Sequence, residues 1–271
     1  MIIKRIVSRF FRERFFDHAA QIAYYLLLSM LPFLIFLFSL LSLFLTNEEA
    51  LLNLLEPFTP SEAFLLIEKN VHLILNKNQG NILYASLLSA FWLSSVAVQA
   101  LARSLDKANG LKRRGVFWKV LIRDLGITLL FMLVVPLSLF LPLIDQAILN
   151  AVSHTDSIQN WQVWLFIRPA IRWGLGTLFL TSFFILFYKV VPTGKISVRE
   201  SIPGALFSAI GWQLFSLAFG KYVATVDYTM LYGQLSGIIL LVLWFYLTAI
   251  IILISGLLNA EMKKKVNKRR S

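Results

Sequence analysis

Six stretches of this chain are apolar and long enough to cross a lipid bilayer, and they constrain its fold more than any other feature. A helix needs roughly 20 residues to cross the hydrocarbon core. Lipid offers no hydrogen-bond partners, so a spanning segment must satisfy its own backbone. We therefore predict an all-α polytopic membrane protein in which residues 1–271 form one domain of six transmembrane helices. The spans are expected at about residues 20–45, 82–102, 120–144, 170–191, 202–222 and 232–259.

The distribution of basic residues predicts the orientation of these spans. The net charge is +12, in a chain of 58% hydrophobic residues. With an even number of spans, 21 of the 26 Lys and Arg fall on one side of the membrane. The positive-inside rule places that side, and both termini, in the cytoplasm. Since topology accounts for the basic charge, we expect no nucleic-acid partner and instead expect attraction to anionic lipids.

The segments outside the spans carry helix signals of their own. Residues 2–16 alternate basic and bulky apolar side chains, which fits an interfacial helix or a basic flank that only sets topology. Between spans one and two, Thr46–Glu49 and Thr59–Glu62 match the capping box of a helix start. We expect two short amphipathic external helices there, at about 47–56 and 60–76.

Signatures of catalysis are absent from the sequence. The three histidines, His18, His72 and His154, lie far apart and match no metal-ligand spacing, and there is no cysteine. No acid lies deep within a predicted span, as the carboxylates of proton relays and intramembrane proteases would. We predict no catalytic residue, no metal site and no cofactor, and hence a protein that is not an enzyme.

The first span carries polar residues that a simple anchor would not need. Gln21, Tyr25 and Ser29 recur every four residues and so share one helix face, and Pro32 follows within a turn. Polar side chains in lipid are costly unless they face protein or water. The stripe predicts either contacts between helices or the wall of a substrate path, and Pro32 is a candidate hinge.

A second polar stripe runs along span two towards its basic end. Such a stripe fits a vestibule open to the cytoplasm, and it equally fits an ordinary gradient of polarity at the membrane interface. Arg123, at the start of span three, is expected to join the same network. The candidate path residues in this stripe are Ser95, Gln99, Arg103, Asp106 and Lys107.

Small residues and a proline mark candidate packing or hinge positions. Pro136 in span three removes a helix hydrogen bond and favours a kink. Gly204 opens span five, and Gly233 and Gly237 form a GxxxG pattern at the start of span six. Small residues four apart let helix backbones approach closely in lipid, so helix packing is the favoured interpretation.

Four segments resemble a known family. They are HAAQIAYYLLLSMLPFLIF near the start, FWLSSVAVQALARSLDKANG in span two, YKVVPTGKISVRESIPGALFSAIGWQLFSLAFGKYVA around span five, and YGQLSGIILLVLWFYLTAIIILISGLLNAEM at the end. They are similar, in this order, to the YihY/virulence factor BrkB family, whose members were once labelled ribonuclease BN. The resemblance implies a six-helix protein of the bacterial inner membrane, associated with envelope lipid handling. Where the family often has an acid before the asparagine near the end of span six, this chain has Leu257 and Leu258.

These observations lead to a functional hypothesis with one alternative. We expect a transporter or exporter of a lipid or amphiphile in the bacterial inner membrane, with anionic membrane lipids as partners. The alternative is a membrane scaffold or envelope-assembly factor that transports nothing. A homo-oligomer is left open by the sequence.

Overall fold

The computed structural model describes residues 2–44, 80–111, 117–138, 161–225 and 235–270, and the regular secondary structure in these ranges is helical throughout. The predicted all-α class is thus confirmed for this part of the chain. The predicted external helices at 47–56 and 60–76 lie outside the described residues. The chain forms two compact units, residues 1–24 with 97–271 and residues 25–96, and each is described by itself.

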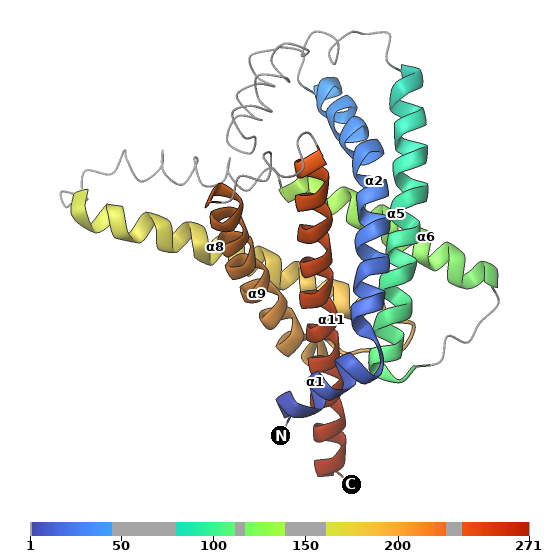
Figure 1. Cartoon of the computed structure of the whole chain (residues 1–271), viewed down its shortest axis with the longest axis vertical. Helices are drawn as coiled ribbons and strands as arrows, with labels where there is room; N and C mark the ends of the chain where they lie inside the picture. The colour runs from blue at the N-terminus through green and yellow to red at the C-terminus, as the bar shows by residue number, and fades with distance from the viewer. Residues whose placement is uncertain (1, 45–79, 112–116, 139–160, 226–234, 271) are drawn as a thin grey trace. The chain divides into compact units, whose positions relative to one another are not determined.

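Each predicted span coincides with a helix, and most of the helices exceed the predicted limits (Figure 1). The apolar window marks only the part of a helix suited to hydrocarbon, whereas the helix itself continues into polar and basic residues. A further helix, α1, precedes the first predicted span. The bounds are α1 Ile2–Arg12, α2 Phe15–Phe44, α5 Gly80–Asn109, α6 Phe117–Ser138, α8 Trp161–Val190, α9 Val198–Thr225 and α11 Ser236–Arg270.

Three helices in the described ranges are long and apolar enough to cross a membrane. The qualifying segments are Trp173–Val190 of α8, all of α9, and Ser236–Lys265 of α11. The predicted spans at 20–45, 82–102 and 120–144 coincide with α2, α5 and α6, and their crossing of the membrane remains a prediction, as does the orientation of the termini.

Helices α8, α9 and α11 pack into a three-helix group through α9, which contacts both of the others (Figure 1). Buried hydrogen bonds join the group. The Tyr188 hydroxyl of α8 donates to the Ile252 carbonyl oxygen at 2.8 Å and lies 2.6 Å from the Ser208 hydroxyl of α9. Trp212 and Trp244 meet edge to face, with ring centroids 6.0 Å apart. Polar side chains are therefore used here to fix apolar helices against each other.

The start of α9 is fixed by a capping box that the sequence spells as Ser197-Val198-Arg199-Glu200. The Glu200 amide donates to the Ser197 hydroxyl at 3.3 Å, and the Ser197 amide donates to the Glu200 carboxylate at 2.9 Å. These bonds satisfy two amides that a helix start would leave unpaired. Lys263 of α11 also contacts Glu200, at 3.1 Å, so the cap links α9 to α11.

Candidate functional site

Helix α1 is amphipathic and lies against the C-terminal half of α11 (Figure 1). Ile6 and Phe10 are buried, whereas Ile3, Val7 and Phe11 are exposed and share one helical row. Most of the remaining positions are Arg or Lys, so α1 presents a buried apolar strip, an exposed apolar row and a basic face.

Arg9 is the ionic centre of this region. Its side chain is 12% exposed, and its guanidinium donates to the Glu13 carboxylate at 2.7 Å and to the Glu261 carboxylate of α11 at 3.0 Å. It also donates to the carbonyl oxygen of Ala108, near the end of α5, at 3.0 Å. One side chain thus holds together elements from both ends of the chain. The hydrogen bond from Arg9 lowers the pKa of Glu13, although partial burial opposes that shift.

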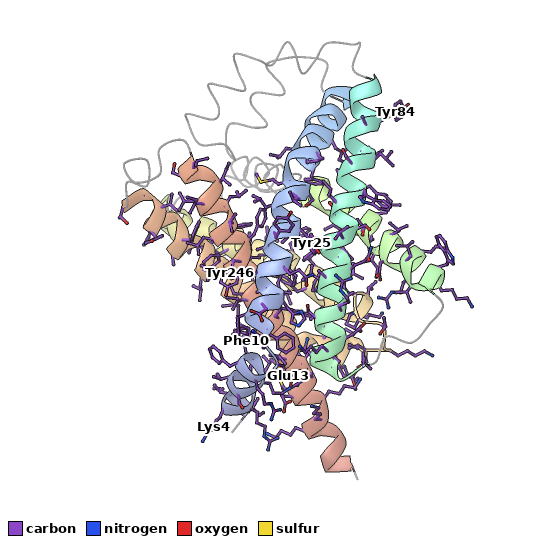
Figure 2. All side chains as sticks on the ribbon, turned by 45° about the vertical axis from the view of Figure 1, so that its right-hand side comes forward. Lys4, Phe10, Glu13, Tyr25, Tyr84 and Tyr246 are labelled. Carbon is purple, nitrogen blue, oxygen red and sulfur yellow. The ribbon has the colours of Figure 1, made fainter. Side chains whose placement is uncertain are left out.

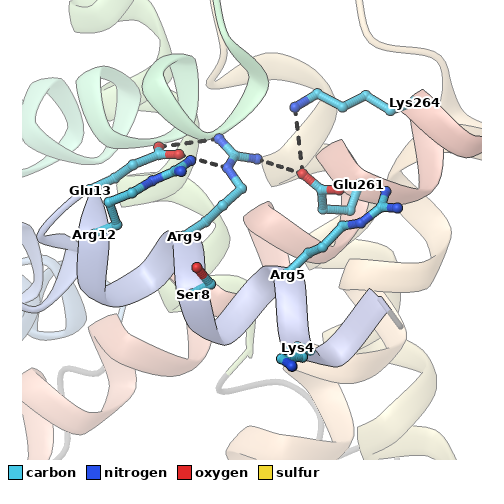
Figure 3. A pocket seen from close by; sticks show the side chains of 8 residues that line it. All are labelled: Lys4, Arg5, Ser8, Arg9, Arg12, Glu13, Glu261 and Lys264. Atoms are coloured by element: carbon cyan, nitrogen blue, oxygen red, sulfur yellow. Dashed lines mark hydrogen bonds and ion pairs between the residues drawn. The ribbon is translucent and has the colours of Figure 1, made fainter.

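A pocket of about 610 Å³ opens around this centre (Figure 3). It contains five cationic side chains and two carboxylates, and the carboxylates are the partners of Arg9. Arg5, Arg12 and Lys4 are exposed, so their charges face solvent. An excess of guanidinium and ammonium groups beside a serine hydroxyl suits a phosphate or carboxylate ligand. We call this site the α1–α11 pocket; it is lined by Lys4, Arg5, Ser8, Arg9, Arg12, Glu13, Glu261 and Lys264.

The corner between α1 and α2 is fixed beside the pocket. Arg14 adopts a left-handed backbone with φ of 56°, which is costly for a residue other than glycine. Lys107 of α5 donates to the Glu13 carbonyl oxygen at 2.7 Å and lies 3.1 Å from the His18 ring nitrogen. Its ammonium also lies 5.6 Å from the centre of the Phe15 ring. The sequence-predicted path residue Lys107 therefore supports this corner.

Two other predicted residues hold the connection between α8 and α9. Asp106, which is buried, accepts the Thr193 amide proton at 2.7 Å. Arg123 donates to Asp124 at 2.9 Å and to the Val191 carbonyl oxygen at 3.0 Å. Both side chains are thereby positioned by the ends of α5 and α6, where the sequence led us to expect a polar network.

The remaining predicted path residues are divided between the two units. Gln21, Gln99 and Arg103 belong to the unit of residues 1–24 and 97–271, in which Gln21 and Arg103 are exposed. Tyr25, Ser29 and Ser95 belong to the unit of residues 25–96. Ser29 and Ser95 are buried, and the Ser29 hydroxyl donates to the Leu26 carbonyl oxygen of its own helix at 2.9 Å. Whether these residues line one path remains a prediction. Tyr25 is labelled in Figure 2.

The predicted packing positions differ in their surroundings. Gly204 is buried, and a Cβ placed on it would lie 2.5 Å from the Ser255 backbone oxygen of α11. Its amide donates to the Asn259 side chain at 2.6 Å. A Cβ on Gly237 would meet no atom of the described residues within 4 Å. Helix α2 continues through Pro32, Pro136 falls in the last turn of α6, and Gly233 lies outside the described residues.

Sequence comparison identifies the family of this chain. A family model described as virulence factor BrkB matches residues 6–271. The chain belongs to the virulence factor BrkB family. The predicted resemblance is thus confirmed over nearly the whole length. No solved structure matches this BrkB-family chain.

Relatives of this BrkB-family protein are found in several bacteria. It is 33% identical to YfkH of Bacillus subtilis (strain 168), which is described as ribonuclease-like, over 97% of this chain and 95% of that protein. It is 25% identical to a UPF0761 membrane protein of Vibrio vulnificus (strain YJ016), over 97% of this chain and 82% of that one. A UPF0761 membrane protein of Xanthomonas campestris pv. campestris (strain B100) is 26% identical over 94% of this chain and 59% of its own length. Together with the apolar helices, these relatives confirm a bacterial multi-pass membrane protein.

The α1–α11 pocket was not among the predicted sites. Arg9 and Glu261 are 252 positions apart, and no local spacing relates them. The available signal was Glu261 itself, an acid that directly follows a long apolar run and precedes a cluster of lysines. An acid in that position needs a cation or solvent, and Arg9 supplies the cation.

Proposed function

We propose that this protein is a transporter or exporter of an anionic lipid or similar amphiphile, with both termini in the cytoplasm. The observation that carries the proposal is the chemistry of α1. One face of this helix lines a basic pocket, while another exposes Ile3, Val7 and Phe11. Basic groups attract anionic headgroups, and an exposed apolar row favours the acyl region of a membrane.

In this proposal the polar stripes of the predicted first and second spans form the path. The residues expected to line it are Gln21, Tyr25, Ser29, Ser95 and Gln99. The headgroup is attracted at the cytoplasmic end by the cations at positions 103, 107 and 123. The helices move at the candidate hinge positions, which are Pro32, Pro136, Gly204, Gly233 and Gly237. In this proposal the protein carries out no covalent chemistry.

The alternative is a scaffold that transports nothing, and one observation favours it. Helices α9 and α11 are in such close contact at Gly204 that a single added methyl group would overlap the Ser255 backbone oxygen. A group of helices packed this tightly suits a rigid platform for other envelope proteins at least as well as a moving transporter. A copy of this chain is among the partners such a platform would hold.

Transport is tested in proteoliposomes that contain phosphatidylglycerol with a fluorescent acyl chain. The protein should accelerate movement of this lipid between leaflets, measured by chemical quenching of the outer leaflet. Arg5→Ala with Arg12→Ala should slow it, since each cation near an anionic surface contributes about 1 kcal/mol. Arg103→Ala and Gln99→Leu test the proposed path in the same assay.

The matched control is Lys195→Ala with Arg199→Ala, which also removes two exposed cations but lies outside the α1–α11 pocket. It should leave lipid movement unchanged. If the purified protein moves no lipid at all while binding other membrane proteins, the scaffold is correct. Native mass spectrometry of each variant reports in parallel whether anionic lipid is retained.

A further inference from the structure

A second cavity lies on the apolar side of α1. It measures about 500 Å³ and is lined by side chains of α1, α9 and α11. We propose that this groove holds one acyl chain of an anionic phospholipid from the leaflet that contains α1. The lining residues are all apolar: Ile3, Ile6, Val7, Phe10, Phe11, Phe207, Ile254 and Leu258.

The lining determines the chemical class of the occupant. Neither a headgroup nor a polar solute would find a hydrogen-bond partner among these side chains, and burying it unpaired would cost several kcal/mol. The volume lies within the range of about 300–1,000 Å³ typical of sites for small molecules. Several lining residues remain exposed, among them Ile3 at 76% and Phe11 at 63%. An apolar chain that covered them would remove this surface from water.

The groove continues a surface of α9 that is suited to hydrocarbon. Phe207 lines the groove, and Ile210, Leu214 and Leu217 follow it on the same side of the helix, each at least 48% exposed. Helix α9 is one of the three that are long and apolar enough to span the bilayer. An acyl chain of the surrounding bilayer could therefore move along this row into the groove without leaving an apolar environment.

The charge beside the groove selects an anionic lipid over a neutral one. Lys4 is exposed and lies at the edge of the α1–α11 pocket, two turns from Phe11 of the groove on the same side of α1 (Figure 2). The other basic side chains of that pocket continue around the helix from Lys4, away from the groove. A molecule with an apolar chain and a negative headgroup would satisfy both surfaces of α1, which a purely apolar ligand or an apolar protein segment would not.

The inference rests on the proposed function only in naming a lipid as the ligand, and its test does not require transport. The protein is placed in nanodiscs that contain phosphatidylglycerol with a photoreactive diazirine near the end of one acyl chain. After illumination, the labelled peptides are mapped by mass spectrometry. We expect label to concentrate on peptides with Phe207, Ile254 and Leu258, at least five-fold above the exposed far end of the α9 row near Leu217.

Two variants and one matched control sharpen the result. Phe207→Trp and Ile254→Trp fill the groove and should reduce labelling there at least five-fold. Leu217→Trp makes the same kind of change on the exposed row of α9, outside the groove, and should not. Photoreactive phosphatidylcholine and the free photoreactive fatty acid should each label the groove less than phosphatidylglycerol does.

Other outcomes overturn the inference. Label spread evenly over the exposed apolar surface would show ordinary contact with bulk lipid, and cross-links between two copies of the chain would show a protein occupant. If the variants with tryptophan do not fold, the distribution of label on the unaltered protein decides. Labelling of the groove without lipid movement in proteoliposomes would remove only the transport proposal, and lipid movement with an unlabelled groove would remove only this one.

Discussion

Arg9 is the residue on which the arrangement of α1 depends most. Its partner Glu261 is 6% exposed, and the only other cation recorded on that carboxylate in the described residues is Lys264, at 3.5 Å. Removing Arg9 would leave a buried carboxylate with a weak partner. Breaking a buried pair in this way costs about 3–5 kcal/mol, more than the pair itself contributes, because the remaining charge stays desolvated.

We therefore predict that Arg9→Met lowers the free energy of unfolding by about 3 kcal/mol, with α1 released first. Equilibrium unfolding in mixed micelles measures the loss, and limited proteolysis at the N-terminus reports the release. Arg5→Met, which removes an exposed arginine from the same helix, should change the free energy by less than about 0.5 kcal/mol. In Arg9→Met with Glu261→Met, much of the stability should return. A double variant as unstable as the single one would contradict this account.

Gly204 gives a second prediction at the scale of a residue. Gly204→Ala would place a methyl group 2.5 Å from the Ser255 backbone oxygen, which cannot rotate away as a side chain can. Overpacking of this kind costs about 1–3 kcal/mol. Gly220→Ala is the matched control in the same helix, because a Cβ there meets no atom of the described residues within 4 Å. Gly220→Ala should leave the stability of the protein unchanged or raise it, and the thermal unfolding temperatures of the two variants compare them directly.

At the scale of an element, the corner between α1 and α2 should respond to pH. Burial lowers the pKa of His18 below its ordinary value of 6.5, and the charges of Lys107 and Arg103 lower it further, while Asp17 opposes them. The folded corner thus binds a proton less tightly than the unfolded chain does. Its stability is complete above pH 6.5 and declines as the pH falls from there through the folded pKa.

Hydrogen exchange of the α1 amides, corrected for intrinsic rates, measures this effect. Protection should be lower at about pH 5.5 than at about pH 7.5, and His18→Gln should abolish most of the difference. Glu13 adds a separate loss at lower pH, because the hydrogen bond from Arg9 lowers its pKa, and the stabilisation that is complete above 4.5 is lost as the pH falls below that value through the folded pKa. Equal pH dependence in His18→Gln would assign the response to another group.

The positions of the helices could be predicted from the sequence far better than their contacts. Apolar length locates a helix because the requirement of lipid is local, and α8, α9 and α11 follow it closely. The capping box at Ser197 and Glu200 is also a local pattern, although it was not among the capping boxes predicted from the sequence. The bonds of Arg9 could not be predicted from a local pattern, since they join distant segments and depend on how helices cross. For the same reason Lys107 and Arg123, expected to face a ligand, also hold backbone oxygens.

At the scale of the whole molecule, the number of spans decides the location of the termini. With six spans both ends lie on the same side of the membrane, whereas spans at α8, α9 and α11 alone would place them on opposite sides. The chain has no cysteine, so single-cysteine variants can be labelled without a background. We predict that Lys4→Cys and Lys265→Cys are both protected from an impermeant maleimide in intact cells and both react after the cells are opened. Ser153→Cys, expected on the outer side, should react in intact cells.

The bond between Arg9 and Glu261 also determines when, during synthesis, α1 can be fixed in its final position. The two residues are separated by 252 positions. A ribosome that adds about 5–20 residues per second therefore makes Glu261 between about 13 and 50 seconds after Arg9. Throughout that interval α1 is fully synthesised, yet the Glu261 carboxylate and the apolar side chains of α11 that hold it do not exist. The first helix to be synthesised is thus among the last to be fixed, and a chain truncated before Glu261 would expose α1 to membrane proteases.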